Sequence, residues 1–194
     1  VVCASTGIAA INAGGVTLHS MFQLPFAPYI PETTFNNNQR RFSFPKGKIR
    51  LLRSIDVLVI DEVSMVRADV LDAIDSVLRR YRHRYKPFGG VQLLLIGDLQ
   101  QLAPVVRQED WDLLGKYYDS PYFFSSKALQ QLDYYTIELK KVYRQSDPEF
   151  LNLLNMVREN RMTSEALAHL NSRCIPNFDP PKEEGYIRLT SHNS

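Results

Sequence analysis

The chain has 194 residues, of which 44% are hydrophobic and 23% are charged. These values are ordinary for a globular protein of one domain, or of one domain and a fragment of another. No apolar run approaches the length that crosses a bilayer, and no basic region precedes the apolar N-terminus as in a secretory signal. Cys3 and Cys174 form no CxxC pair, which argues against a zinc site and fits a reducing compartment.

Basic residues are concentrated in two segments, although the net charge is only +2. The segment 33–55 has no acidic residue and carries Arg40, Arg41, Lys46, Lys48, Arg50 and Arg53. The second segment carries Arg79, Arg80, Arg82, Arg84 and Lys86. A basic run without acids can follow a phosphate backbone, and the alternative is a solvated loop. For the second segment we favour a helix end whose cations complement the helix dipole.

In chain order, the first predicted element is a buried strand at residues 1–4. Ser5-Thr6-Gly7 then opens a short helix that runs through Ile8 to Ala13. Residues 16–22 predict another short helix, and the prolines that follow predict an inserted loop over about residues 26–50.

Further buried strands are predicted at residues 56–60, 91–96 and 134–139 because these runs are almost continuously apolar. Residues 66–86 predict the clearest helix. Its apolar residues recur at helical spacing at Val66, Val70, Ile74, Val77 and Tyr81. Strands this apolar are normally covered on both faces, so the pattern favours an α/β domain with a parallel sheet flanked by helices.

The pattern changes after residue 145. Ser146 or Asp147 is placed to cap a helix that has Pro148 in its first turn. A second helix is predicted after Thr163-Ser164, and residues 186–190 predict a strand.

Two predicted strands end in side chains that suit nucleotide chemistry. In LVIDEVSM, Asp61 and Glu62 follow a strand, where one carboxylate can hold Mg²⁺ and the next can polarise a water. In LLLIGDLQQLAPV, Gly97-Asp98 ends a strand and Gln101 follows, and a glutamine can orient water beside a γ-phosphate. Each pattern alone is also explained by a strand that happens to end in polar residues.

Two other segments add weaker signals. Thr6 and Gly7 stand at a predicted helix N-terminus, which favours a phosphate but is also explained by simple capping, and His19 follows in the same segment. Arg144, in KKVYRQ, lies where the pattern changes and is placed to reach a transferring phosphate, although an ordinary surface arginine is the alternative.

Taken together, the order and spacing of these motifs resemble those of superfamily I helicases. The resemblance is closest to the Pif-type (petite integration frequency) DNA helicases, relatives of RecD. TGIAAINAGGVTLHSMFQLP resembles the motif with which that family grips single-stranded DNA, and IDEVSM resembles its Walker B motif. GDLQQLAPV and VYRQ resemble its third and fourth motifs.

The resemblance implies a RecA-like (P-loop NTPase) fold and a 5′-to-3′ helicase that uses ATP and Mg²⁺ on single-stranded DNA. It implies that Asp61 holds Mg²⁺ through water, that Glu62 activates water, that Gln101 senses the γ-phosphate and that Arg144 completes the site. It also implies DNA contacts at Thr6, Gly7 and His19. The basic run without acids adds Arg40, Arg41, Lys46 and Lys48 as expected DNA contacts. The expected division is a first motor domain at 1–145, a helical and Pro-rich connection at 146–185 and the start of a second motor domain at 186–194.

One family motif is missing, because GxxxxGK[ST] occurs nowhere in the sequence. We therefore interpret the chain as an internal fragment without its phosphate loop, inactive as an ATPase alone. The alternatives are a nucleic-acid-binding module without ATPase activity and a RecD-like subunit of a nuclease-helicase. We expect no membrane, a monomeric parent, and a cytoplasmic location in a bacterium or a nuclear or mitochondrial one in a eukaryote.

The family arrangement makes a specific prediction about the sheet. The strands near Val1, Asp56 and Val91 should be parallel neighbours in that order. The strand at 134–139 should be separated from the Val91 strand or paired abnormally with it.

Overall fold

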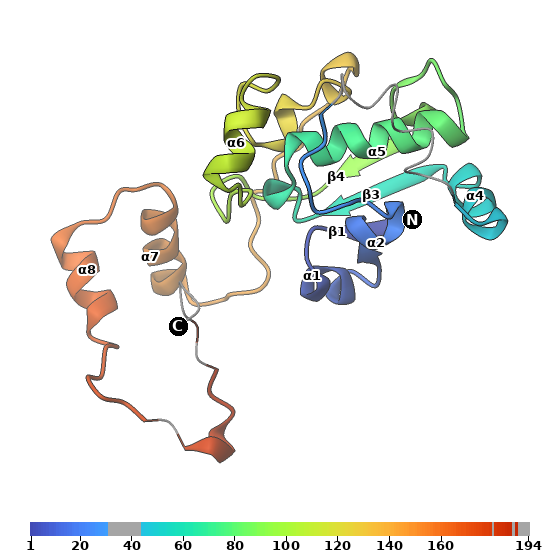
Figure 1. The fold of residues 1–194 in the computed structure, drawn as a ribbon. Coiled ribbons are helices and arrows are strands. Elements are labelled where there is room, and N and C mark those ends of the chain that lie inside the picture. The colour runs from blue at the N-terminus through green and yellow to red at the C-terminus, as the bar shows by residue number, and fades with distance from the viewer. Residues whose placement is uncertain (31–43, 180, 188, 190–194) are drawn as a thin grey trace. The chain divides into compact units, whose positions relative to one another are not determined.

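A parallel sheet with strand order β2-β1-β3-β4 organises the first part of the chain (Figure 1). The strands are β1 (Val2–Ala4), β2 (Val16–Thr17), β3 (Val57–Asp61) and β4 (Gln92–Leu95). All three pairings are parallel. The predicted order of the three longer strands is therefore confirmed, and the two-residue β2, which was expected to be helical, lies outside β1.

The computed structural model describes residues 1–30, 44–179, 181–187 and 189. The chain divides into two compact units, Val1–Thr136 and Ile137–Ser194.

Helices cover the sheet of the first unit, with α5 on one side and α1 and α2 on the other (Figure 1). Their bounds are Gly7–Asn12 for α1, Leu18–Phe22 for α2, Lys46–Arg53 for α4, Ala68–Tyr81 for α5 and Gln108–Leu114 for α6. Single 3₁₀ turns occupy Val63–Met65, Pro87–Gly90, Phe123–Ser125 and Leu129–Gln131. Among the residues that the structure describes, no helix is both long and apolar enough to cross a bilayer.

The predicted long helix is shorter than expected at both ends. Val66 and Arg67 are extended, and Arg82 leaves the helical region with φ −121° and ψ −103°. The predicted apolar face is nevertheless correct, because Ile74 and Val77 are fully buried against the sheet. Full burial of one such side chain contributes about 1.5–3 kcal/mol.

Two predicted strands are wrong. Residues 134–139 form no strand, and Tyr135 and Leu139 are 97% and 89% exposed. A strand is stable only when its backbone groups find a ladder partner, and this run has none among the described residues. Of the predicted strand at 186–190, the described residues Tyr186, Ile187 and Leu189 are also outside any strand.

A buried carboxylate fastens the loops after α6 to α5. Asp72 of α5 accepts hydrogen bonds from the Tyr118 hydroxyl at 2.8 Å, the Ser126 hydroxyl at 2.6 Å, and the amides of Lys127 and Ala128 at 3.1 and 2.9 Å. Burial, followed by the charge of Asp72, raises the pKa of Tyr118 well above its usual range, so the phenol remains a donor. This cluster is called the Asp72 clamp below.

The outer side of β4 is an open sheet edge within the described residues, because β4 pairs only with β3. Leu93 and Leu95 pack against the main core, whereas Leu94 and Ile96 are 51% and 45% exposed. An edge strand of this kind presents free backbone groups beside apolar side chains.

The second unit consists of α7 (Pro148–Arg158), α8 (Ser164–Asn171) and a 3₁₀ turn at Lys182–Glu184. Both predicted helices are confirmed. Asp147 caps α7, with Pro148 in the first turn, and Thr163 caps α8.

Candidate functional site

The carboxyl ends of β1, β3 and β4 meet at one edge of the sheet, and each strand leads there into one of the predicted motifs. The register pairs Ala4 with Asp61, and Ile60 with Leu95. In open parallel α/β sheets, ligands bind outside this edge. The sheet therefore places the loops that begin at Ser5, Asp61 and Gly97 side by side.

Asp61 and Glu62 form a turn directly at the tip of β3. Glu62 has left-handed backbone angles, φ 51° and ψ 45°, and its amide donates to Oδ1 of Asp61 at 3.0 Å. A left-handed conformation is unfavourable for a residue with a Cβ and is often found at functional positions. Both carboxylates are half-buried, so they remain within reach of a ligand at the edge of the sheet.

Gly97 brings the loop after β4 against the loop after β3. A Cβ atom at Gly97 would lie 3.0 Å from the amide nitrogen of Ser64 and 3.0 Å from Cγ1 of Val63. The amide of Val63 also donates to the carbonyl of Ile96 at 2.9 Å. The two acidic loops are therefore held at a close and fixed spacing.

Gln101 is held by Asp98 rather than pointing freely into solvent. Its Nε2 donates to Oδ2 of Asp98 at 3.0 Å, and Oδ1 of the same carboxylate accepts the amide of Gln100 at 3.0 Å. This partner of Gln101 was not predicted. An Asp in a turn commonly accepts the backbone amide two residues on, so the sequence indicates the bond from Gln100 but not the one from the Gln101 side chain.

Of the predicted DNA contacts near β1, Thr6 and Gly7 start α1. The Thr6 hydroxyl accepts the amide of Ala9 at 3.2 Å, so it acts as the helix cap, and Gly7 is exposed beside it. Capping was the simpler interpretation of this segment, and a role in DNA binding stays a prediction.

His19, on α2, forms a flat aromatic surface with Phe26. Their ring centroids lie 5.1 Å apart at an interplanar angle of 17°. Burial, followed by the nearby charge of Arg67, lowers the pKa of His19 below its ordinary 6.5. The imidazole is therefore neutral at pH 7 and suits stacking better than ion pairing.

The predicted basic contacts have different surroundings. Lys46 is exposed at the start of α4, whereas Lys48 is half-buried and its Nζ donates to Sδ of Met21 at 3.5 Å. Arg40 and Arg41 lie outside the described residues. Arg144 belongs to the second unit, where it is exposed, and its catalytic role stays a prediction.

Further groups beside the motifs were missed by the sequence analysis. Asp69 is buried, receives two hydrogen bonds from Arg67 at 2.8 and 2.7 Å, and accepts the amide of Tyr29 at 2.9 Å. Ser5 and Ser64 have buried hydroxyls that make no hydrogen bond with the described residues. Nothing in the sequence pattern signals these arrangements, because they depend on tertiary burial.

The carboxylates fit an Mg²⁺ ion that arrives with a nucleotide. No group of three metal-ligating side chains occurs among the residues that the structure describes. Nucleotide-borne Mg²⁺ does not need such a cage, because it binds through one or two carboxylates together with phosphate oxygens and water. Asp61, the last residue of β3, has the kind of carboxylate that this binding requires.

Parallel strands in this order, with acidic and glutamine-bearing loops along their carboxyl edge, define a RecA-like α/β fold. A family profile described as "PIF1-like helicase" matches residues 1–166. The chain belongs to the PIF1-like helicase family.

Individual relatives agree with this assignment. The human "ATP-dependent DNA helicase PIF1" is 37% identical over 178 residues, which cover 89% of this chain and 25% of that protein. The Saccharomyces cerevisiae "ATP-dependent DNA helicase RRM3" is 34% identical over 162 residues, which cover 84% of this chain and 21% of that protein. The chain thus spans about a fifth to a quarter of the length of these relatives.

Solved structures show the same fold. A crystal structure of the Pif1 helicase from Bacteroides in complex with ADP-AlF3 and ssDNA has a TM-score of 0.90 and 41% identity. The match covers 99% of this chain and 44% of that one. The Pif1 helicase from Candida albicans has a TM-score of 0.71 and 33% identity, and the match covers 92% of this chain and 38% of that one.

Proposed function

We propose that the chain is part of the motor of an ATP-dependent, 5′-to-3′ DNA helicase that moves along single-stranded DNA. The observation that carries the proposal is the meeting of Asp61, Glu62 and the Asp98–Gln101 pair at one edge of a parallel sheet. The relative from Bacteroides whose structure contains ADP-AlF3 and ssDNA supports both the nucleotide and the DNA.

Within this proposal, MgATP is the substrate. Asp61 would hold the Mg²⁺ that arrives with the nucleotide, and Glu62 would accept a proton from the attacking water. Gln101, which donates to Asp98 in this structure, would sense the γ-phosphate. Arg144 neutralises charge on the transferring phosphate.

The phosphates also need a cradle of backbone amides and a lysine, and GxxxxGK[ST] does not occur in these 194 residues. The 194-residue chain alone should therefore hydrolyse ATP at no more than the background rate. A helicase is better supported than a nucleic-acid-binding module without ATPase activity, because the Asp61 and Glu62 carboxylates have no use in such a module.

The test is Glu62→Gln in the full-length helicase that carries this chain. DNA-stimulated ATP hydrolysis should fall by about 10²–10⁴-fold, as expected for loss of a general base. Binding of a fluorescent ATP analogue should stay within a few-fold of normal, because Asp61 remains.

Glu109→Gln is the matched control, because Glu109 is exposed in the first turn of α6 and belongs to none of the loops that carry Asp61, Glu62 and Gln101. Its hydrolysis rate should be unchanged. A Glu62→Gln protein that keeps its turnover within a few-fold of normal would show that Glu62 is not the base.

A further inference from the structure

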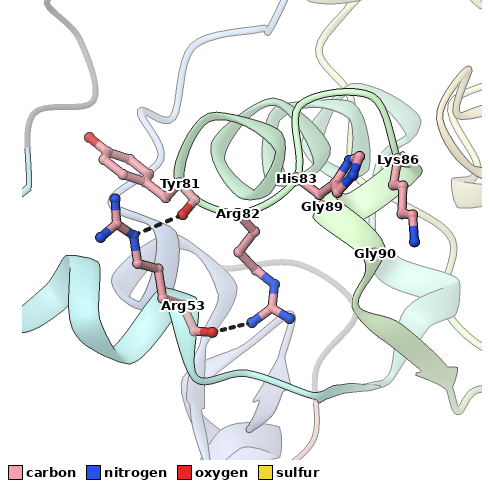
Figure 2. Close-up of a pocket in the computed structure, with 7 residues that line it drawn as sticks. All are labelled: Arg53, Tyr81, Arg82, His83, Lys86, Gly89 and Gly90. Carbon is pink, nitrogen blue, oxygen red and sulfur yellow. Dashed lines mark hydrogen bonds between the residues drawn. The ribbon is translucent and has the colours of Figure 1, made fainter.

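Figure 2 shows the residues that line a basic pocket, whose volume is about 500 Å³. This pocket lies at the opposite end of the strands from the acidic loops. The lining residues are Arg53, Tyr81, Arg82, His83, Lys86, Gly89 and Gly90. They come from the last turns of α4 and α5, from the loop that follows α5 and from the 3₁₀ turn that precedes β4. Since the strands are parallel, these segments lie at the amino ends of β3 and β4, away from Asp61 and Glu62.

Two arginines build this pocket by capping each other's helix. Nε of Arg53, on α4, donates to the carbonyl of Tyr81 at the end of α5 at 3.2 Å. Nη1 of Arg82, after α5, donates to the carbonyls of Leu52 and Arg53 at the end of α4 at 3.3 and 2.5 Å. Figure 2 shows the Arg53–Tyr81 and Arg82–Arg53 bonds of this reciprocal pair. The pair satisfies helix-end carbonyls and fixes two guanidinium groups beside each other.

The cations around the pocket are not neutralised by acids in its lining, which contains neither Asp nor Glu. Nε of Arg82 is buried without a hydrogen-bond partner among the described residues. Asp75, a nearby carboxylate of α5, is engaged by Arg79 at 2.8 Å and by the amide of Phe88. An uncompensated group of cations at fixed positions attracts an anion.

Lys86 is the lining cation that is free to meet a ligand. It is exposed and forms no ion pair with any described residue. The stem of Lys86 runs close to Gly90, because a Cβ added to Gly90 would lie 3.2 Å from Cδ of Lys86. Gly90 has φ +76°, a conformation that favours glycine, so the chain keeps the surface beside the Lys86 stem free of a side chain.

The pocket suits a phosphate group rather than a base. Tyr81 supplies one aromatic ring of the lining, and that ring packs at a tilt on Phe44 with centroids 5.2 Å apart. Arg80 also lies over the Tyr81 ring, with Cζ 5.5 Å from its centroid, so this ring is already engaged by two neighbours. Arg84, exposed in the same loop, continues the positive surface beyond the pocket, as a polyanion requires.

We propose that this pocket binds a phosphate of a nucleic-acid backbone, as a contact separate from the predicted contacts at Thr6, Gly7 and His19. The proposal rests on the proposed function, because it assumes that the protein works on DNA. Arg53 and Arg82 hold the pocket open, and Lys86 makes the direct contact.

The test is Lys86→Gln in the full-length helicase, with Arg53 and Arg82 left intact so that the pocket still forms. Affinity is measured by fluorescence anisotropy at several salt concentrations, with a single-stranded oligonucleotide and with a duplex. Loss of one phosphate contact should reduce the slope of log K against log salt by about 0.7 for the single strand or 0.9 for the duplex. The DNA form whose slope changes is the one that the pocket holds.

Lys86→Arg should keep the wild-type slope, and Lys116→Gln, at an exposed lysine outside the pocket, is the control for loss of one charge. Unchanged slopes for both DNA forms in Lys86→Gln, while the unaltered protein binds DNA, would overturn this inference and leave the proposed function standing. Failure of the unaltered protein to bind either DNA would overturn both.

Discussion

Gly97 sets the spacing between the two acidic loops, so its lack of a side chain has a measurable consequence. Gly97→Ala places a Cβ 3.0 Å from the Ser64 amide and from Val63. Backbone cannot move aside as a flexible side chain does, so we expect a loss of about 1–3 kcal/mol in the free energy of unfolding. Urea denaturation of the 194-residue chain measures it.

Gly47→Ala is the matched control for this substitution. Gly47 lies inside α4 and has nothing within 4 Å of an added Cβ. Alanine there should stabilise the chain by about 0.5–1 kcal/mol, because alanine favours the helix over glycine. Equal effects of the two substitutions would mean that the loops after β3 and β4 are not tightly packed.

His19 should make the folding stability of the chain depend on pH. Its pKa is lowered in the fold, first by burial, so the unfolded chain takes up a proton at a higher pH than the folded chain. The free energy of unfolding that the neutral His19 contributes is therefore fully present above the ordinary pKa of about 6.5. It is lost as the pH falls from that value toward the lowered pKa.

Urea midpoints measured from about pH 7.5 down to pH 5.5 check this expectation. His19→Gln should remove part of the loss of stability at low pH, whereas His83→Gln, at an exposed histidine, should leave that loss unchanged. Identical pH profiles for wild type and His19→Gln would refute the assignment.

At the scale of elements, the Asp72 clamp holds the segment 118–129 against α5 through four hydrogen bonds to one carboxylate. Asp72→Asn replaces one acceptor oxygen with a donor that faces other donors. Hydrogen bonds to a charged group contribute about 1.5–3 kcal/mol, so we expect a loss of at least that size in the free energy of unfolding.

Asp119→Asn is the control, because Asp119 is exposed in the loop that the clamp holds. Hydrogen exchange of the Lys127 and Ala128 amides should accelerate in Asp72→Asn alone. Protection that survives in this variant would show that other contacts hold the loop.

Elements with strong local signals could be predicted from the sequence, and those that depend on partners could not. The apolar period of α5 and the caps at Thr6 and Asp147 are local, and the structure bears them out. By contrast, β2 has only two residues and exists because it pairs with β1. Residues 134–139 have the composition of a strand but find no ladder partner within the part of the chain that the structure describes.

At the scale of the whole molecule, the motifs could be predicted to share one edge because parallel strands all end there. The same reasoning could not reveal the hold of Asp98 on Gln101 or the reciprocal pair of Arg53 and Arg82. These contacts join residues through loop geometry, and loop geometry depends on packing that leaves no periodic trace in the sequence.

The apolar edge of β4 should make the isolated 194-residue chain associate with itself. Leu94 and Ile96 stand beside free backbone groups, and such an edge pairs readily with another strand. Leu94→Lys should reduce the concentration-dependent increase in mass seen by light scattering. Ile11→Lys, at a 79% exposed position on α1, should not. Association that is equally strong in Leu94→Lys would place the contact elsewhere.

The open edge also affects the loop that carries Gln101. That loop leaves directly from β4, so its order depends on how firmly β4 is held, and β3 is the one strand that pairs with β4 among the described residues. By mass action, any segment that adds a strand there stabilises the folded unit, and the melting temperature then rises with the concentration of that segment. A short peptide that binds the β4 edge would thus act on the Gln101 loop without touching it.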